Sequence, residues 1–459
     1  MESLDRFFHL KERGTNVKTE FLAALTTFVT VAYVLAVNPT VLADAGMDHG
    51  AIFTTTALIA AIGTLLMGLL SNYPFVVVPD MALNAFFTYT VVVGMGYTWQ
   101  AALAAVLIEG LLFILISVTK LRDILVNAVP ATLKVALIGG LGLFLTIVGL
   151  KGSGLMVSNN STFIAMVSWH TLYANGGFTT AGVCSLLAII GVMITAILIA
   201  RNVKGNILIG IVCTWVLGMI CQLAGWYVPD PASGFYSLFP DFSNGIAVPS
   251  IAPVAFKFDF SQVASVGFIT VVIAMLLSSV FDVIGTLIGT ASQAHLLNED
   301  GSLEKSRGAL LSEALAITLA GVLGNSPTCV GVESSAGVAE GGRTGLTAVF
   351  VALFFGVSLV LSPLFLAIPS FATAPALITV GFMMFGTTAS IAWNDATEGV
   401  PAFIMIIAMP FFYSIAEGIF LGIISYVVIN GLSGKENRKK VTPVMWVLCA
   451  LFILKYFFV

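Results

Sequence analysis

The sequence predicts an all-α polytopic membrane protein, and three observations lead to this fold class. Of the 459 residues, 58% are hydrophobic and 9% are charged, whereas a soluble protein devotes about a quarter of its residues to charge. The mean hydropathy is +1.04. The apolar residues gather in runs of about 20, the length that crosses a bilayer. This composition excludes a water-soluble enzyme, a disordered chain and a nucleic-acid-binding protein.

Seven apolar runs occupy the first half of the chain, near 20–41, 51–71, 74–93, 98–119, 131–150, 178–200 and 205–226. A polar loop follows over about 227–261. The second half has runs near 262–290, 309–324, 325–340, 344–368, 371–392, 400–430 and 443–458. We therefore expect about 14 transmembrane segments.

The basic residues predict the orientation of these segments. With a cytoplasmic N-terminus, the outer loops hold only Lys151 and Lys257. The inner side then collects Arg6, Lys11, Arg13, Lys18, Lys120, Arg122, Lys134, Arg201, Lys204, Lys305, Arg307 and Arg343. This distribution follows the positive-inside rule and favours the plasma membrane, in a bacterium the inner membrane.

The stretch 400–430 allows two interpretations. A pair of short helices broken around Pro410 would keep Lys435, Arg438, Lys439 and Lys440 inside, in agreement with the same rule. The run 443–458 would then be an interfacial or partly inserted tail helix. A single tilted helix is the alternative, and we favour the pair.

Two runs do not read as ordinary spanning helices, and each is the third segment of its half. The first contains FVVVPDMALNAFF (Phe75 to Phe87), and the second contains GNSPTCVGVESSAG (Gly324 to Gly337). Proline and glycine oppose a continuous helix, and irregular backbone at membrane depth is tolerated where it is buried or lines a cavity. Matched interruptions in two halves indicate an inverted-repeat transporter. Short helices packed through small residues are the alternative.

Few ionisable side chains lie within the apolar runs, and each is a candidate functional residue because its insertion into a bilayer is unfavourable. Asp282 lies late in the eighth run, Glu333 follows the second interruption and Glu109 is near the middle of the fourth run. Asp80 lies at the first interruption, and Glu313 begins the ninth run. A structural role as the partner of another polar group is the alternative for Glu109.

The amide of Asn84 follows the first interruption, beside the aromatic Phe86 and Phe87. Carboxylates, an amide and an aromatic ring suit a small, flat, neutral solute that forms hydrogen bonds, such as a nucleobase. An acid that gains a proton on one side and loses it on the other would couple transport to protons. A backbone-bonded amide is the alternative for Asn84.

The five cysteines, Cys184, Cys213, Cys221, Cys329 and Cys449, show no CxxC spacing. We therefore expect no disulfide, metal site or cofactor, and we leave the role of Cys329 open. No nucleophile and base pair is evident, so we expect no enzyme.

Four strings resemble the adenine/guanine/hypoxanthine permease branch, called AzgA-like, of the nucleobase:cation symporter-2 family. They are LNAFF (Leu83 to Phe87), FDVIGTLIG (Phe281 to Gly289), VESSAGVAEGGRTGLTAV (Val332 to Val349) and EGVPAFIMIIAMPFFYSIAEGI (Glu398 to Ile419). The resemblance implies a uracil-permease-like fold with two inverted seven-segment repeats and short paired strands in the broken segments 3 and 10. It also implies a core domain over 1–119 and 228–370 and a gate domain over 120–227 and 371–459.

Carried over by position, the resemblance assigns substrate binding to the third-segment amide Asn84 and to the eighth-segment acid Asp282. Phe86 is the candidate aromatic ring beside Asn84. Glu333 and the following Ser334 match the tenth-segment motif. Ser279 stands three residues before Asp282, where some members have a second carboxylate.

The predicted proton-coupling residues are Asp282 and Glu333, with Glu109 as a further candidate. Asp80 and Glu109 depart from the family pattern, so both are candidates for altered specificity.

The sequence thus predicts a secondary active importer of adenine, guanine or hypoxanthine by proton symport, acting in the lipid bilayer without nucleic acid. The alternatives are a carrier of the same fold for a pyrimidine, an ascorbate-like compound or an anion, a passive channel, or a membrane scaffold. The preferred purine, the stoichiometry and the formation of a homodimer stay open.

Overall fold

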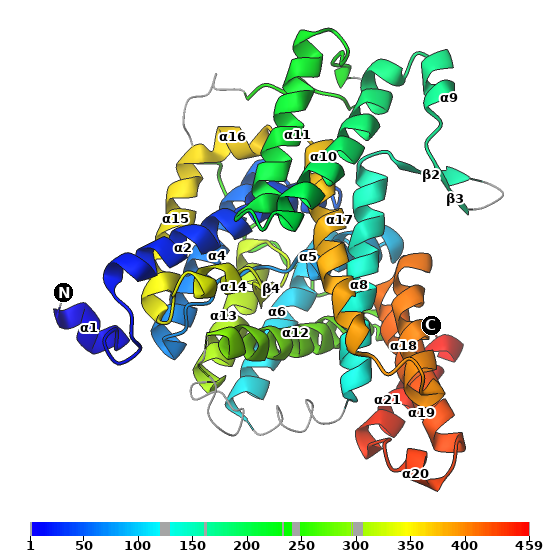
Figure 1. Ribbon diagram of the computed structural model, residues 1–459. Coiled ribbons are helices and arrows are strands. Elements are labelled where there is room, and N and C mark those ends of the chain that lie inside the picture. The colour runs from blue at the N-terminus through cyan, green and yellow to red at the C-terminus, as the bar shows by residue number, and fades with distance from the viewer. Residues whose placement is uncertain are drawn as a thin grey trace.

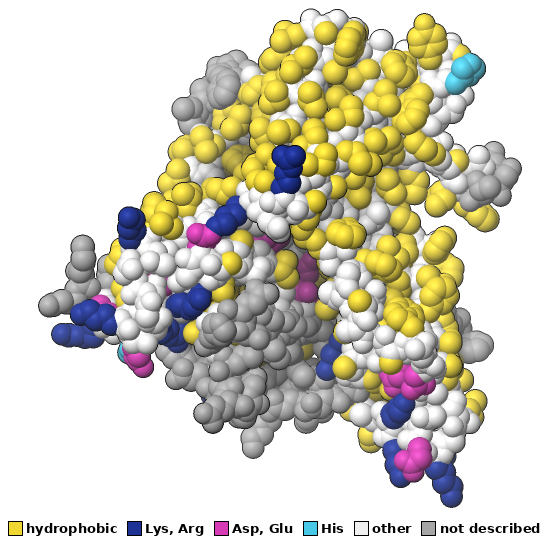
Figure 2. All heavy atoms as spheres, viewed as in Figure 1, with side chains coloured by type: hydrophobic (Ala, Val, Ile, Leu, Met, Phe, Trp, Pro, Cys, Tyr) yellow, Lys and Arg dark blue, Asp and Glu magenta, His cyan; other side chains and the backbone are white. Residues whose placement is uncertain are grey.

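The computed structural model describes residues 2–119, 129–159, 163–231, 234–240, 248–294, 296 and 306–458. Within these residues, nine helices are long and apolar enough to cross a membrane. Four shorter apolar helices accompany them, over Met81–Gly94, Gly267–Val280, Ala396–Phe411 and Glu417–Leu432. Figure 2 shows mainly hydrophobic side chains over the surface of α10 and α11, while charged side chains lie lower in this view, among them groups near α1 and α20. The protein is a polytopic membrane protein.

The elements of the first half follow the predicted runs (Figure 1). They are α1 (Glu2–Phe8), α2 (Val17–Val31), α3 (Val34–Ala43), α4 (His49–Ser71), β1 (Val77–Pro79), α5 (Met81–Ala85), the π-helix η1 (Phe86–Gly94), α6 (Trp99–Val118), α8 (Ala131–Gly152), β2 (Met156–Asn159), β3 (Phe163–Met166), α9 (Trp169–Ala174), the π-helix η2 (Phe178–Gly182), α10 (Val183–Ala200) and α11 (Asn206–Leu223). The first predicted run is thus two helices, and β2 and β3 form an unpredicted antiparallel hairpin.

The second half begins with the longest helix. Its elements are α12 (Val266–Gln293), α13 (Ser306–Leu323), β4 (Thr328–Val330), α14 (Ser334–Ala339), α15 (Gly345–Ser358), the 3-10 helix η4 (Leu359–Leu361), α16 (Ser362–Leu366), α17 (Ser370–Gly386), the 3-10 helix η5 (Thr387–Ser390), α18 (Ala396–Phe411), α19 (Ile415–Leu432), α20 (Lys435–Arg438) and α21 (Pro443–Phe458).

The stretch 400–430 is a pair of helices, as favoured above, but the break lies after Pro410 rather than around it. Pro410 belongs to the last turn of α18. Tyr413 has a φ of 52°, in the left-handed region, and the Ser414 side chain accepts a hydrogen bond from the Glu417 backbone N–H. A left-handed residue followed by a serine cap ends one helix and begins another.

The helices pack in two groups that meet around α12. In the first helix group, α4 packs against α13 and α15, α13 packs against α6, and α15 packs against α2. In the second helix group, α8 packs against α17 and α18, α18 against α19, and α10 against α11 and α17. α12 contacts α6 and β4 on one side and α8 and α19 on the other.

Glycines permit the close approach of helices within each group. A Cβ on Gly68 of α4 would lie 2.7 Å from the Gly345 carbonyl oxygen of α15, and one on Gly142 of α8 would lie 2.5 Å from the Gly381 carbonyl oxygen of α17. Small residues at such crossings let the two backbones touch, which is how membrane helices gain packing energy.

The two interrupted segments meet through an antiparallel strand pair, as the resemblance implies. β1 pairs with β4 in the register Val77 with Val330, Val78 with Cys329 and Pro79 with Thr328. The Asp80 N–H donates to the Pro327 carbonyl, and the Gly331 N–H donates to the Val76 carbonyl, each at 2.9 Å. The pairing thereby satisfies backbone groups that a broken helix leaves open within the membrane.

A buried acid ties the start of α2 to the start of α15. Glu20 is fully buried, and its carboxylate accepts hydrogen bonds from the backbone N–H groups of Arg343 at 3.0 Å, Thr344 at 3.3 Å and Thr347 at 3.1 Å. The Thr347 hydroxyl donates to the same carboxylate. Arg343 and Thr344 directly precede α15, and Thr347 lies in its first turn. Backbone N–H groups at the start of a helix have no partner within it and favour a negative charge.

We expect Glu20→Ala to lower the free energy of unfolding by about 3 kcal/mol, because several buried donors lose their acceptor. Thermal unfolding of the purified protein in detergent measures the effect. Glu12→Ala is the control, since the Glu12 side chain is 76% exposed. Equal midpoints for the two variants would contradict a structural role for Glu20.

Candidate functional site

Glu333 lies where β4 gives way to α14, at the cap position before Ser334. Its side chain does not cap the helix, so the carboxyl group is available for other contacts. Oε1 accepts a hydrogen bond of 2.8 Å from the Tyr33 hydroxyl, and the residue is half-buried. Tyr33 stands at the junction of α2 and α3 and is 3% exposed. The first segment therefore contributes to the site, in addition to segments 3 and 10.

Two more carboxyl groups and a thiol gather beside the strand pair. One ligand atom from each of Asp80, Asp282 and Cys329 lies within 4.8 Å of the others. Asp80 also caps α5, because its Oδ1 accepts from the N–H groups of Ala82 at 2.8 Å and Leu83 at 3.3 Å. The three groups supply fewer donors than the four of a structural zinc site.

Two further acids form a layer behind this group. Glu109 of α6 and Glu313 of α13 are fully buried. The Ser279 hydroxyl donates to Glu109 Oε1 at 2.5 Å, and the Thr328 hydroxyl donates to Glu313 Oε1 at 2.7 Å. Oε2 of each glutamate has no hydrogen-bond partner within the described part of the chain. Ser279 therefore contacts a second acid, Glu109.

Asn84 belongs to a buried network of amides and hydroxyls. Its Nδ2 donates to Asn38 Oδ1 at 2.6 Å, and Asn38 Nδ2 donates to Thr56 Oγ1 and to Asn325 Oδ1, each at 2.8 Å. Asn325 Nδ2 donates in turn to Thr55 Oγ1 at 2.9 Å. The network joins α3, α4 and α5 to the residues that lead into β4. Asn84 Oδ1 is buried without a partner among the described residues.

Phe86 and Ser334 are also fully buried. The Ser334 hydroxyl accepts from the Val76 N–H at 3.0 Å and donates to the Gly331 carbonyl at 2.7 Å, so it completes the end of the strand pair. Of the six residues predicted to bind substrate, Asp282 and Glu333 are half-buried, and Asn84, Phe86, Ser279 and Ser334 are fully buried. Their roles stay predictions.

The charge of this region is one-sided. Asp80, Glu109, Asp282, Glu313 and Glu333 surround the strand pair, and no described lysine, arginine or histidine forms an ion pair with any of them. Isolated carboxylates are unfavourable in a medium of low polarity, so the region suits protons and N–H donors and disfavours anions.

Sequence reasoning missed Tyr33, Asn38 and Asn325. The string AYVLAVNPT (Ala32 to Thr40) places a tyrosine and an asparagine within an apolar run and a proline directly after the asparagine. That string is a weaker form of the signal that identified segment 3, so the polar residues of the first segment could have been candidates.

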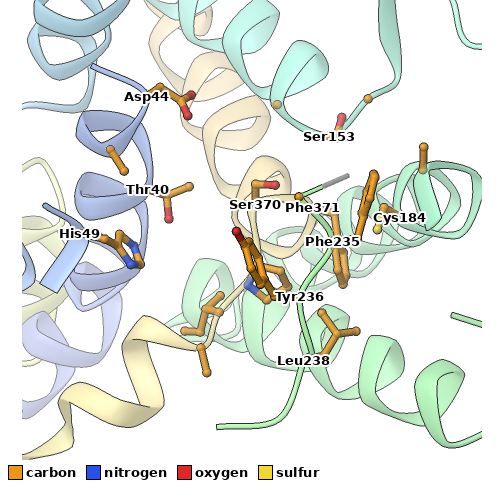
Figure 3. A pocket seen from close by; sticks show the side chains of 18 of the residues that line it. Thr40, Asp44, His49, Ser153, Cys184, Phe235, Tyr236, Leu238, Ser370 and Phe371 are labelled. Carbon is orange, nitrogen blue, oxygen red and sulfur yellow. The ribbon is translucent and has the colours of Figure 1, made fainter. Parts of the chain in front are cut away.

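A separate cavity of about 660 Å³ lies between α3 and the loop that follows α11. Figure 3 shows Thr40, Asp44 and His49 on one side of it, and Phe235, Tyr236, Phe371 and Cys184 on the other. Asp44 accepts a 2.6 Å hydrogen bond from the Tyr89 hydroxyl of η1. Lys151 Nζ, which also lines the cavity, lies 5.7 Å from the Tyr89 ring centroid and 5.1 Å from that of Tyr413. None of the five acids around the strand pair lines it.

Apolar helices around two interrupted, paired segments define a polytopic membrane transporter. The fold resembles the transmembrane domain of the cyanobacterial bicarbonate transporter BicA, with a TM-score of 0.61 over 89% of this chain and 97% of that chain, at 16% identity.

The profile described as Permease family matches residues 18–421. Adenine permease AdeP of Escherichia coli is 38% identical and covers 99% of this chain and 96% of its own length. Guanine/hypoxanthine permease PbuG of Bacillus subtilis is 40% identical, over 98% of this chain and 99% of its own. The chain belongs to this permease family, the nucleobase:cation symporter-2 family, which confirms the resemblance.

We expect Asn38→Ala to destabilise the protein by about 3 kcal/mol, because Asn84, Ser326, Thr56 and Asn325 each lose a partner in a buried network. Unfolding midpoints in detergent measure the loss. Asn175→Ala is the matched control, since Asn175 is exposed after α9. A midpoint for Asn38→Ala that equals the control would contradict a structural role for the network.

Proposed function

We propose that the protein is a secondary active importer of purine nucleobases that works by proton symport. The observation that carries the proposal is the half-buried Glu333 carboxyl group beside the β1 and β4 strand pair, with no basic partner among the described residues. The full-length similarity to relatives named for adenine, guanine and hypoxanthine supports the same substrate class.

In this proposal Glu333 holds the base. A carboxylate accepts hydrogen bonds and donates none, so Glu333 would accept from an N–H of the base through the oxygen that Tyr33 does not hold. Asn84, Phe86, Ser279 and Ser334 would contribute indirectly. They would hold α5, α12 and the strand pair, which position the acids.

Asp282 and Glu333 are the proposed proton-coupling residues, with Glu109 as the buried partner of Ser279. Several acids close together in a membrane interior cannot all be ionised, because each further charge repels the others at low polarity. A proton that binds with the base would lower the negative charge of the site during transfer. A protonophore should therefore reduce accumulation of the base.

A carrier of the same fold for an anion is the rival that the comparison with the bicarbonate transporter raises. The five acids around the strand pair argue against it, because an anion would meet uncompensated negative charge. Helix N-termini can bind anions, but here the side chain of Asp80 already occupies the N-terminus of α5.

For the movement, we propose that residues 1–119 and 228–370, which include the first helix group and α12, act as a core that carries the site. The second helix group, over 120–227 and 371–459, would act as the gate against which it moves. The proposed location is the plasma membrane, with the N-terminus in the cytoplasm.

We expect Glu333→Gln to reduce purine uptake at least about tenfold, because a hydrogen bond to a charged acceptor contributes about 1.5–3 kcal/mol. Uptake of radiolabelled adenine, guanine, hypoxanthine and uracil is measured in cells that lack their own nucleobase permeases. Glu436→Gln is the control, since that side chain is 87% exposed. Undiminished uptake by Glu333→Gln, or no purine uptake by the unaltered protein, would overturn the proposal.

Gly331→Ala tests the position of the same carboxyl group. A Cβ at Gly331 would lie 2.8 Å from Glu333 Oε2 and 2.9 Å from Val76 Cγ1, so the carboxyl group must shift. We expect apparent affinity for purine to fall about tenfold, since a misplaced binding group loses much of its effect. Gly356→Ala in α15 is the control, because no atom lies within 4 Å of its Cβ. Equal affinity in both variants would show that the carboxyl group does not hold the base.

A further inference from the structure

The two kinds of relative leave the preferred purine undecided, because an adenine permease and a guanine/hypoxanthine permease are 38% and 40% identical to this chain. The structure offers a physical basis for the choice in the contact between Tyr33 and Glu333. The inference rests on the proposed function, since it assumes that Glu333 meets a purine.

The Tyr33 hydroxyl has a single hydrogen bond within the described part of the chain, its 2.8 Å donation to Glu333 Oε1. A phenol has one proton to donate, so Oε1 is held as an acceptor. As long as Tyr33 donates to Oε1, a proton carried by the carboxyl group lies on Oε2. A hydrogen bond donated to a carboxylate is stronger than one to a neutral acid, so Tyr33 favours the ionised form of Glu333.

Among the described residues, the ionisable groups besides Tyr33 that interact with Glu333 are two acids and a thiol. Asp282 of α12, Asp80 between β1 and α5, and Cys329 of β4 interact with it electrostatically. No basic side chain offsets them among the residues that the structure describes. The Tyr33 hydroxyl is thus the side-chain donor that stabilises a negative charge on Glu333.

The two classes of purine differ in the hydrogen-bond donors and acceptors that they present to a carboxyl group. A 6-oxopurine carries an N–H donor at N1, and guanine adds the neighbouring 2-amino donor. Adenine has an acceptor at N1 beside its 6-amino donor. An ionised carboxylate accepts from the donors of a 6-oxopurine and repels the N1 acceptor of adenine, whereas a protonated carboxyl group matches adenine by donating to N1 and accepting from the 6-amino group.

We propose that Tyr33 is a positioning residue that keeps Glu333 an acceptor and thereby selects 6-oxopurines, such as guanine and hypoxanthine, over adenine. Tyr33 need not contact the base. It acts through Glu333 by fixing which oxygen is free and by favouring the ionised carboxylate while the base is bound. The proton that accompanies the base then lies on Asp282, the other proposed coupling residue.

Competition for uptake of radiolabelled hypoxanthine by the unaltered protein is the first test, in cells that lack their own permeases and at one fixed external pH. We expect guanine to compete about tenfold better than adenine, because guanine can donate its N1–H to the Glu333 carboxylate and adenine cannot. We also expect 1-methylhypoxanthine, which lacks the N1 donor, to compete about tenfold more weakly than hypoxanthine. This comparison needs no variant and so does not depend on the folding of one.

Tyr33→Phe is the second test, because it removes one hydroxyl and keeps the ring. We expect the ratio of guanine to adenine apparent affinity to fall several-fold, with purine uptake retained. Tyr426→Phe is the matched control, since the Tyr426 hydroxyl donates to Glu398 at 3.2 Å, outside the proposed site. A merely structural role for Tyr33 would lower uptake of both purines equally and leave the ratio unchanged.

The outcomes separate the two proposals. Purine uptake with a preference for adenine, full competition by 1-methylhypoxanthine, or an unchanged ratio in Tyr33→Phe would overturn the role of Tyr33 and leave purine transport standing. No purine uptake by the unaltered protein would overturn the proposed function itself.

Discussion

The backbone of a membrane protein must find its hydrogen-bond partners inside the protein, and the rest of this structure depends on that constraint. Segments 3 and 10 are broken by Pro79 and Pro327, which leaves backbone groups without helical partners. The backbone groups of β1 and β4 form hydrogen bonds with one another. The hydroxyl of Thr64 donates to the Val77 carbonyl at 3.1 Å and accepts from the Val77 N–H at 2.9 Å. The breaks can therefore expose side chains at membrane depth without exposing unpaired backbone.

The same arrangement concentrates negative charge. Asp80 is fixed by its role as a helix cap, while Glu109 and Glu313 are fixed by hydroxyl groups of α12 and β4. Three of the acids are thus engaged by structural partners. Asp282 and Glu333 lie nearest to solvent among the five.

Much of this fold could be predicted from the sequence, because apolar runs of the right length and prolines within them report directly on membrane segments. The interruptions at Pro79 and Pro327 and the pair of helices within 400–430 are of this kind. The break at Tyr33 was not predicted, since neither proline nor glycine lies beside it. Contacts such as Asn84 with Asn38 depend on which helices lie side by side, and one sequence does not report that.

The acids themselves were predicted from their rarity in apolar runs, but their environments were not. Ser279, a predicted binding residue, donates its hydroxyl to Glu109, and Asn84 donates one amide hydrogen bond to Asn38. Polar residues within membrane segments therefore indicate the region of a candidate site. They do not indicate which of their atoms are free to contact a solute.

The contact between Glu20 and Thr347 spans 327 positions of the chain, and this separation has a consequence for biosynthesis. The first membrane segment leaves the ribosome with a carboxylate whose partners are not yet translated. Until α15 arrives, that charge must stay near the headgroups or be shielded by water or by the insertion machinery. The start of α2 can reach its final depth only after most of the polypeptide has been made, so assembly of the two halves is a late event during synthesis.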